Sequence, residues 1–377
     1  MSKTLQDYAT LVNDTIQSNE INHYITTDNM RQNLGGIDTL KNINIPQGKV
    51  RSFQKDDVLL SNIRLYFRKV YRAKQKGGCS SDVLVFRAKH IDSATLFAIL
   101  SSQIFTDYAC SGSQGSKMPR GNKTHMMDFK IPTINFTIAK IFNSIQNKID
   151  NNHKINELLH KILELLYEQY FVRFDFLDEN NKPYQTSGGK MKFSKELNRL
   201  IPSGWSVRFL NHKIVSTYQP KTISKTLLND SYSYSVYGGG GIIGRFTEYN
   251  HEQSEFIISC RGQCGISYLT LPKSWITGNA MVIRPTKSYT SKTYLYHTIK
   301  KYKLTNYITG SVQPQITRQN LSTMPILIPK RKTLNKWNNI SSLLWNLIHN
   351  SMQSTQTLTA LRDFLLPLLL KQQVKPQ

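Results

Sequence analysis

The chain has 377 residues, with 49 Lys and Arg against 24 Asp and Glu, so its formal net charge at pH 7 is +25. This length permits two or three domains with separate cores and excludes one small disulfide-stapled module. The positive field attracts polyanions, of which nucleic acid is the first candidate. A merely basic protein is the alternative, and an acidic membrane surface is disfavoured because the charge is scattered along the chain.

The chain ends and the cysteines argue against secretion and metal binding. The N-terminal MSKTLQDYATLVNDTI lacks the apolar run of a signal peptide, and FLLPLLL near the C-terminus is about a third of a membrane-spanning length. Cys79, Cys110, Cys260 and Cys264 have no His or Cys at zinc-finger spacing, so we interpret them as free thiols. We expect a cytoplasmic protein.

Short apolar runs of strand length recur nearly 200 residues apart. Ser61 matches Ser259 at a distance of 198 residues, and Gly112 matches Gly310 at the same distance. The matched segments are 57–64 with 255–262, 80–88 with 277–285, and 111–132 with 309–329. Three matches in the same order predict two copies of one strand-rich unit.

Each strand-rich unit is followed by apolar residues three and four apart, which is the helical period. The first series predicts a helix to about Tyr170, and we expect the two helices to pack antiparallel on each other, although either alone resembles an ordinary amphipathic surface helix. The expected buried stripes are Ile138, Ile141, Ile145, Ile149, Ile155, Leu159, Ile162 and Leu166, and then Ile340, Leu343, Leu347, Leu358, Leu361 and Leu365.

The predicted fold class is α+β, with two strand-rich domains separated by two long antiparallel helices that form a coiled-coil spacer, and with an internal pseudo-repeat. The expected order is a strand-rich domain (1–137), a central spacer helix (138–176), a polar Gly-rich linker (177–199), a second strand-rich domain (200–332) and a C-terminal spacer helix (333–371).

The sequence offers no convincing catalytic, cofactor or metal site. Gly239, Gly241 and Gly244 satisfy G-x-G-x-x-G, but a β-like RFTEY follows them where a dinucleotide site needs a helix, so we predict a tight turn. Such a turn also lets the backbone approach DNA. The phosphate-loop and adenine-methyltransferase motifs are absent, and a nuclease would need clustered carboxylates that the chain lacks.

Seven stretches spread over almost the whole chain carry a family resemblance. They are YITTDNMRQNLGGI (24–37), DVLLSNIRLYFRKVYRA (57–73), SGGKM (187–191), LIPSGWSV (200–207), YGGGGIIGRF (237–246), FIISCRGQCG (256–265) and TGSVQPQIT (309–317). In letters and in order they resemble the DNA-specificity (S) subunits of type I restriction-modification systems. The first half departs from the pattern, because LQDYATL lacks the Pro-Ser-Gly-Trp entry of the second half.

The resemblance implies two target-recognition domains, each for one half of a split double-stranded DNA site. It also implies that the helices act as spacer and as dock for two adenine methyltransferase subunits, which are joined in some systems by restriction and translocase subunits. The chain itself would have no catalysis and no cofactor. A stand-alone sequence-specific DNA-binding repressor is the alternative.

DNA contact requires Lys and Arg for phosphates, and Arg, Gln, Asn and aromatic groups for base edges. The segment 64–78 interleaves basic and aromatic residues, and the repeated polar segments lie just before the helices. For any single Arg, an ordinary solvated surface charge is an equal alternative. The predicted DNA-binding residues are Arg64, Arg68, Lys69, Arg72, Lys117, Arg120, Lys221, Lys225, Tyr237, Arg245, Arg261, Gln313 and Arg318.

Overall fold

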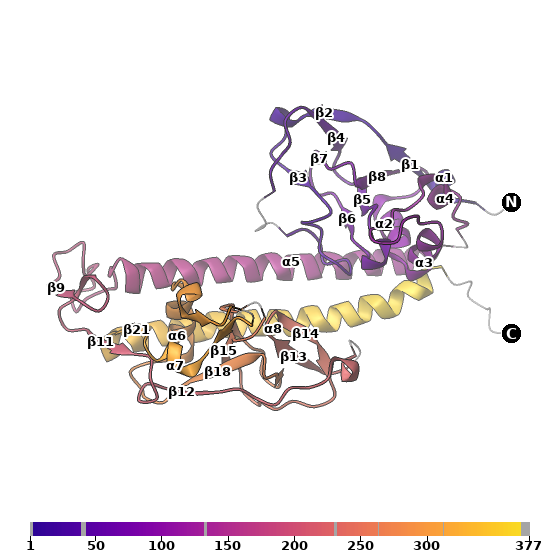
Figure 1. Ribbon diagram of the computed structural model, residues 1–377. Helices are drawn as coiled ribbons and strands as arrows, with labels where there is room; N and C mark the ends of the chain where they lie inside the picture. Colours follow the sequence, from indigo (N-terminus) through magenta and orange to yellow (C-terminus); the bar gives the residue numbers. More distant parts are fainter. Residues whose placement is uncertain are drawn as a thin grey trace. The chain divides into compact units, whose positions relative to one another are not determined.

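The computed structural model describes residues 3–38, 43–131, 134–229, 232–262, 264–311 and 313–370. The chain divides into two compact units: unit 1 contains Met1–Lys154 and Met352–Gln377, and unit 2 contains Ile155–Ser351. Both units contain a four-stranded antiparallel sheet and part of each of two long helices (Figure 1). The unit boundaries therefore cross the long helices, whereas the predicted boundaries separate helices from strands. The predicted end of the last helix, residue 371, lies outside the described residues.

Unit 1 is built on two four-stranded sheets. The first has the order β1 (Ala9–Val12), β8 (Val83–Ala88), β5 (Val58–Ser61), β6 (Val70–Arg72), and the second has the order β2 (Thr15–Gln17), β4 (Lys49–Phe53), β7 (Gly77–Cys79), β3 (Tyr24–Ile25). Its short helices are α1 (Leu5–Tyr8), α2 (Ser93–Ser101), α3 (Gln103–Ser111) and α4 (Lys123–Met127). All four residues of β5 are buried, which explains why its first three, Val58 to Leu60, are apolar without alternation.

Unit 2 repeats the first of these sheets with the order β12 (Val215–Tyr218), β18 (Ala280–Pro285), β15 (Phe256–Ser259), β16 (Ser267–Leu269). A second sheet contains β14 (Gly241–Phe246), β13 (Tyr234–Gly238) and β17 (Trp275–Ile276). Unit 2 also contains three separate strand pairs: β9 (Met191–Ser194) with β10 (Arg199–Pro202), β11 (Ser206–Phe209) with β21 (Pro325–Ile328), and β19 (Ile308–Thr309) with β20 (Gln315–Ile316). Its short helices are α6 (Lys292–Lys300) and α7 (Arg318–Leu321). The segment predicted as a linker thus contains β9 and the start of β10.

The two four-stranded sheets have the same strand order, so the predicted internal repeat is present in the fold. Strands β1, β8, β5 and β6 correspond to β12, β18, β15 and β16. In both units a capped helix follows the second strand of this order: the Asp92 side chain accepts from the Thr95 N–H before α2, and Ser291 accepts from the Tyr294 N–H before α6. The second sheets differ in strand order, so the repeated part is the four-stranded sheet with its helix.

An ion pair between an Arg and a buried carboxylate is repeated along with the strands. In unit 1, Arg87 Nε and Nη2 each lie 2.8 Å from a different oxygen of Asp57, and in unit 2, Arg284 Nη2 lies 2.6 Å from Glu255 Oε1. Both carboxylates are buried, and their hydrogen bonds raise the pKa of the two arginines. Because an unpaired buried charge is costly, these pairs restrict the sheets to one arrangement.

Helix α5 (Phe136–Tyr167) has 32 residues and continues into a π-helical turn (Glu168–Val172), while α8 (Arg331–Leu369) has 39 residues. In unit 1, Asn152 Nδ2 donates to Thr355 Oγ1 at 3.1 Å, and Arg362 lies against Gln146 further along. In unit 2, the His160 ring lies 5.1 Å from the Trp345 ring, and Tyr167 pairs with Trp337. Rising numbers on α5 meet falling numbers on α8, so the predicted antiparallel pairing holds within each unit.

The predicted stripes are only partly buried. Ile145 and Ile149 are buried as expected, but Ile141, Ile155 and Ile162 of α5 and Leu343, Leu347 and Leu361 of α8 are exposed. Other buried residues of the two helices, outside the predicted stripes, are aromatic, aliphatic or charged, among them Phe142, Leu163, Tyr167, Trp337, Trp345, Ile348 and Arg362. Each helix is apolar on more than one face, and periodicity alone does not identify which face packs against its own unit.

Candidate nucleic-acid interface

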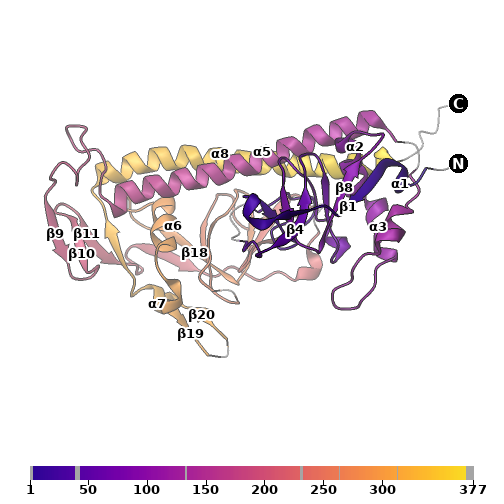
Figure 2. The same cartoon turned by 90° about the horizontal axis from the view of Figure 1, so that it is seen from above.

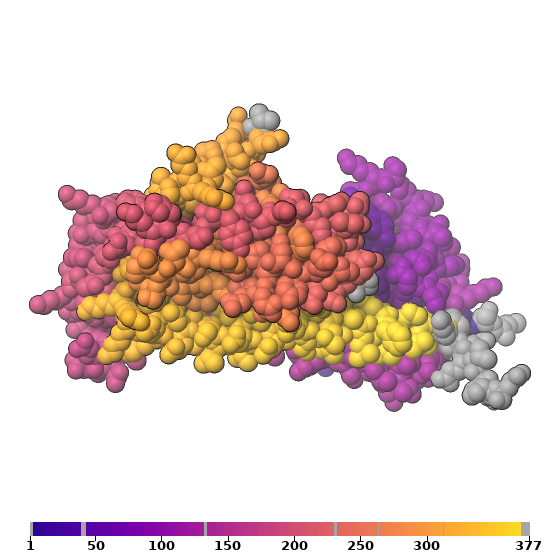
Figure 3. Space-filling view, turned by 90° about the horizontal axis from the view of Figure 1, so that it is seen from below, coloured from indigo at the N-terminus to yellow at the C-terminus, as the bar shows by residue number. Residues whose placement is uncertain are grey.

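Each unit carries a short loop closed by an antiparallel residue pair at equivalent places in the repeat. The first tip loop (residues 114–120) is closed by Gln114 and Arg120, and the second (residues 309–315) by Thr309 and Gln315. Gly115 and Gly310 occupy the same place in the two loops, with φ of 96° and 91°, a region that disfavours side chains. Strands β19 and β20 of the second loop stand out from unit 2 in Figure 2, and the same projection is visible in Figure 3.

The structure corrects the register of the predicted match between Gly112 and Gly310. Gly112 ends helix α3 with φ of −92°, whereas Gly115 has the left-handed conformation of Gly310. The two loops are therefore related by a distance of 195 residues, three fewer than the sequence match indicated. The match based on the repeated Gly and Ser residues pairs Gly112, at the end of a helix, with Gly310, which lies in a loop.

The two loops are anchored to their sheets by the same backbone hydrogen bonds. In unit 1, Asn62 N–H donates to the Asp82 carbonyl at 2.7 Å and Gly121 N–H donates to the Asn62 carbonyl at 3.2 Å. In unit 2, Cys260 N–H donates to the Asn279 carbonyl at 2.9 Å and Ile316 N–H to the Cys260 carbonyl at 3.1 Å. Side-chain caps follow in both, from Asn122 before α4 and from Thr317 before α7. The sequence pattern of 111–132 recurs in 309–329 because both units contain the same loop, the same anchoring hydrogen bonds and the same kind of helix cap.

Three of the predicted DNA-binding residues meet at the first tip loop. Arg64 has φ of 50°, its N–H donates to the Pro119 carbonyl at 2.9 Å, and its guanidinium donates to the Lys117 carbonyl at 3.3 Å. This residue supports the loop from beneath, and the Lys117 side chain is exposed. Arg120 is 63% exposed and lies 2.9 Å from Asp82, so its guanidinium is held in place while facing solvent.

Two apolar side chains at this site were not predicted from the sequence. Tyr66 and Met118 are each 53% exposed, and the Tyr66 ring contacts the Phe67 ring edge-on, with 4.6 Å between their centroids. Exposed apolar groups beside Arg and Lys are typical of surfaces that contact bases as well as phosphates. The alternation of basic and aromatic residues in 64–78 is the sequence feature from which Tyr66 could have been predicted.

The second tip loop brings together three other predicted residues. Arg261 pairs with Gln315 in the backbone bridge, Gln313 is exposed in the loop, and Arg318 is exposed at the start of α7. The Gly-rich turn between β13 and β14 lies against Arg261, because a side chain at Gly239 would come within 2.9 Å of the Arg261 carbonyl. The predicted tight turn between strands is therefore confirmed.

Lys221 and Lys225 are exposed on the segment that leads into β13. This segment packs on Gly278, where a side chain would come within 2.8 Å of the Pro220 carbonyl and of Thr222 Oγ1. Gly278 directly precedes Asn279, which anchors the second tip loop, so Lys221 lies on the same side of unit 2 as that loop.

The prediction for Tyr237 needs correction, because this side chain is in the core of unit 2. It is 3% exposed, its hydroxyl accepts a hydrogen bond from Leu271 N–H at 3.0 Å, and burial raises its pKa to about 12. Ser235 and Val236, its neighbours in β13, are buried as well, so this strand is covered on both faces. We therefore remove Tyr237 from the proposed DNA contacts.

Four predicted basic residues are engaged by their own unit. Arg68 donates to the Ser101 carbonyl at 2.8 Å, and burial lowers its pKa. Lys69 donates to the Thr27 carbonyl, and Arg245 donates to the Tyr232 and Ser233 carbonyls. Arg72 lies 3.9 Å from Asp56. These contacts fix backbone turns, so we rank these residues below those of the tip loops.

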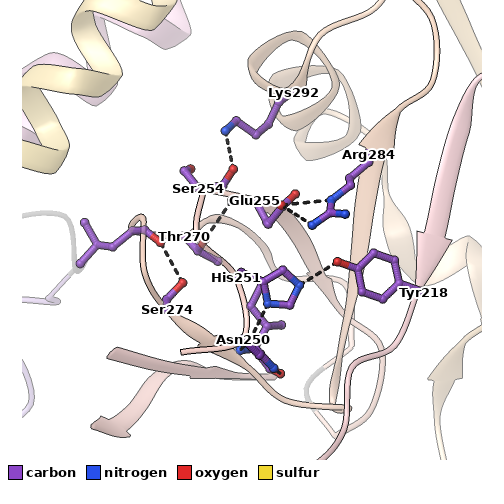
Figure 4. Close-up of polar contacts among 11 residues, drawn as sticks. Tyr218, Asn250, His251, Ser254, Glu255, Thr270, Ser274, Arg284 and Lys292 are labelled. Atoms are coloured by element: carbon purple, nitrogen blue, oxygen red, sulfur yellow. Dashed lines mark hydrogen bonds and ion pairs between the residues drawn. The ribbon is translucent and has the colours of Figure 1, made fainter. Parts of the chain in front are cut away.

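A polar network around the buried His251 of unit 2 resembles a catalytic relay (Figure 4). The Tyr218 hydroxyl lies 2.7 Å from His251 Nε2, and His251 Nδ1 lies 2.5 Å from Asn250 Oδ1. Because Asn250 Oδ1 also accepts from Ile276 N–H, the proton of His251 belongs on Nδ1, and Tyr218 donates to Nε2. Burial lowers the pKa of His251, so the ring is neutral and satisfied within the fold. We interpret this network as structural support.

The comparisons with known proteins agree with this geometry. Residues 202–361 match the family described as type I restriction modification DNA specificity domain. The type I restriction enzyme MjaIX specificity subunit of Methanocaldococcus jannaschii is 21% identical over 312 residues, which cover 73% of this chain and 67% of that protein. The crystal structure of the S subunit of a type I restriction-modification system from M. genitalium has a TM-score of 0.62 at 14% identity, covering 99% of this chain and 96% of that one, and so shares the fold.

The duplicated sheet and the paired long helices are the fold that the M. genitalium S subunit shares. The matched domain, residues 202–361, covers less than half of the chain, and the motifs at 24–37, 57–73 and 187–191 that resemble S subunits lie outside it. Within residues 202–361 the chain is therefore similar to domains that give type I restriction-modification systems their DNA specificity. Among the described residues, no cluster of His, Cys, Asp or Glu fits a metal ion, and no helix has the length and apolarity to cross a membrane.

Proposed function

We propose that the chain recognises a double-stranded DNA site in two halves, one through each tip loop. The observation that carries this proposal is the construction of the two loops: their anchoring hydrogen bonds are the same, whereas their exposed side chains differ. A shared scaffold with different side chains is what two different half-sites require. The strand-rich regions 1–137 and 200–332 are the recognition domains, and the protein acts in the cytoplasm.

The second part of the proposal is that α5 and α8 (138–176 and 333–371 as predicted) bind two methyltransferase subunits. On the unit 2 part of α5, exposed apolar residues recur three or four apart, and Leu158 among them is 61% exposed. On α8, Leu343 is 66% exposed. The complete rows are Ile155, Leu158, Ile162, Leu165, Leu343 and Leu347 in unit 2, and Phe136, Ile141, Leu361, Phe364 and Leu368 in unit 1. Figure 3 shows the uncovered surface of α8 in yellow.

Large exposed apolar rows on a helix indicate a protein partner, because water contact with so much apolar surface is unfavourable. Each unit has one exposed apolar row, just as each has one tip loop. Two copies of one partner, one on each row, fit this duplication. Restriction and translocase subunits would then join through the methyltransferase complex. A stand-alone repressor would need no such rows.

Replacing Leu158 or Leu343 by Lys is expected to weaken methyltransferase binding by roughly tenfold or more without lowering thermal stability. Both side chains are exposed in the chain alone, so a charge there does not destabilise the fold. It becomes unfavourable only when a partner surface covers it. Leu227→Lys, also exposed in unit 2 but outside the long helices, is the matched control. Calorimetric titration of the chain with the methyltransferase subunit measures the effect, and equal binding by all three variants would contradict the docking surface.

The proposed function is tested by expressing the chain with its methyltransferase partner and mapping methylated adenines by single-molecule sequencing. We expect a motif of two defined halves separated by an undefined gap. The purified chain with S-adenosylmethionine should neither methylate nor cut DNA. Methylation by the chain alone would overturn the proposal, and tight sequence-specific binding that is indifferent to the methyltransferase would favour the repressor.

A further inference from the structure

The two tip loops differ at one equivalent pair of side chains. In unit 1 the pair is Arg120, which closes the loop, and Asp82, which anchors it, and the two lie 2.9 Å apart as an ion pair. In unit 2 the corresponding residues are Gln315 and Asn279, which are exposed and uncharged. Unit 1 therefore has two charged side chains where unit 2 has two amide side chains at the same backbone positions.

The equivalence of these positions rests on backbone contacts. The carbonyls of Asp82 and Asn279 both accept from the residue that follows the buried Ser of the sheet, Asn62 in unit 1 and Cys260 in unit 2. Arg120 and Gln315 both form an antiparallel bridge to the next residue along, Ile63 in unit 1 and Arg261 in unit 2. The two side chains therefore leave the same place on the same scaffold.

The two pairs present different hydrogen-bonding chemistry to the solvent. The Arg120 fork has donors only, matching the two acceptors N7 and O6 of guanine, while the carboxamide of Gln315 has a donor and an acceptor, matching N7 and the amino group of adenine. Asp82 is 33% exposed and holds one edge of the guanidinium, which leaves the other donors facing outward in a fixed direction. A charge that served only to attract phosphate would gain nothing from being held by a carboxylate.

We propose that Arg120 with Asp82, and Gln315 with Asn279, determine the base recognised at one position in each half-site. Arg120 selects a G·C pair in the half-site of unit 1, and Gln315 selects an A·T pair in the half-site of unit 2. This inference rests on the proposed function, since it assigns base preference to residues of the two tip loops. The neighbouring Lys117, Arg261 and Arg318 then supply the phosphate contacts that position each loop.

The test is an exchange of the two pairs. The double variant Arg120→Gln with Asp82→Asn gives unit 1 the amide pair of unit 2 and leaves the net charge unchanged. The full chain, co-expressed with its methyltransferase partner, is used to select from a library of duplexes randomised over the site. We expect one G·C position in one half-site to become A·T, with a change in preference of roughly 10- to 100-fold, and the other half-site to stay the same. The reciprocal variant, Gln315→Arg with Asn279→Asp, should produce the opposite change in the other half.

Several outcomes separate the possibilities. If Arg120 contacts only phosphate, the double variant binds all sequences more weakly, the salt slope falls by about one, and the preferred bases are unchanged, which overturns the inference. Replacing the exposed pair Lys273 and Glu252 by Gln, again without net charge change, should alter nothing. A wild-type complex that selects no sequence at all would overturn the proposed function instead.

A variant that keeps the loop intact guards against misfolding. Asp82→Asn alone retains Arg120 and the carbonyl that anchors Asn62, so the fold and the loop closure are preserved. The released guanidinium should discriminate less between G·C and A·T at the same position, while overall affinity rises because a negative charge has been removed. Unchanged discrimination with a normal melting temperature would contradict the role of the pair.

Discussion

Replacing residues 200–330 by the matching segment of a relative is expected to change one half of the recognised DNA sequence and to leave the other half intact. The segment lies entirely within unit 2 and contains its whole four-stranded sheet and the second tip loop. Each base pair that is wrong for the new loop should cost roughly 1–3 kcal/mol, and only in its own half. The methylation pattern of the chimera with its methyltransferase partner measures the outcome.

The reciprocal exchange of residues 3–131 is the matched control, because it carries the first tip loop and both sheets of unit 1. It should change the other half-site and no more. Changes in both halves after either exchange would argue against independent recognition by the two units.

One contact decides how the chimera should be joined. His297 of α6 lies in the exchanged segment, and its ring stacks 5.6 Å from Tyr167 of α5 and lies 5.3 Å from Trp337 of α8, both outside it. Burial lowers the pKa of His297 to about 3, so the ring is neutral at pH 7 and packs as an aromatic group. A donor segment with a charged residue at this position would disturb the core of unit 2, so the donor should keep His or an aromatic residue there.

Much of the architecture could be predicted from the sequence because its signals are local or repeated. VLLS and FIIS each contain three consecutive apolar residues before a Ser, which fits the fully buried strands β5 and β15. The repeat distance of about 200 residues located the second copy before any strand order was known. Apolar residues at helical spacing gave the extent of α5 to within a few residues of its end at Tyr167.

The faces of the long helices could not be predicted, because a partner's surface and the chain's own core select the same residue types. Leu343 was expected to be buried and is exposed, whereas the charged Arg362 is buried. Periodicity reports that a helix has an apolar face and carries no information on what covers it. Only the three-dimensional arrangement distinguishes core from docking surface.

At the tip loops, the basic residues were predictable and their partners were not. Lys117 and Arg120 lie in a polar repeated segment, but Asp82 is 38 residues away from Arg120 and meets it only through the sheet. The residue type and the Gly-rich neighbours of Tyr237 predict DNA contact, but its strand β13 is buried on both faces. Side-chain direction depends on strand pairing, which residue type does not reveal.

Replacing Arg362 by Ala is expected to detach the end of α8 from unit 1. The side chain is 1% exposed and donates to Gln146 Oε1 at 3.1 Å and to the Asn33 carbonyl at 3.2 Å, while Asp363 provides a half-exposed counter-charge at 3.0 Å. Asn33 has φ of 53°, and its N–H donates to the Phe67 carbonyl, so Arg362 joins α8 both to α5 and to the turn beneath the first sheet. Its removal leaves the buried Gln146 Oε1 and the partly buried Asn33 carbonyl without this donor, and a cavity where the side chain was.

These losses should lower the free energy of unfolding of unit 1 by roughly 3 kcal/mol or more. Hydrogen exchange of the amides of residues 355–369 is the direct measurement, because a single melting temperature does not describe a chain of two units. Arg362→Met keeps the apolar stem, so it should lower the free energy of unfolding of unit 1 by less. Arg331→Ala, at the exposed start of α8, should leave this free energy almost unchanged. Because the tip loop of unit 1 keeps its own anchors, the base preference of its half-site should survive at low temperature and disappear on warming before that of the other half. Unchanged exchange rates in Arg362→Ala would show that the apolar residues Leu366 and Leu369 alone hold α8 to unit 1.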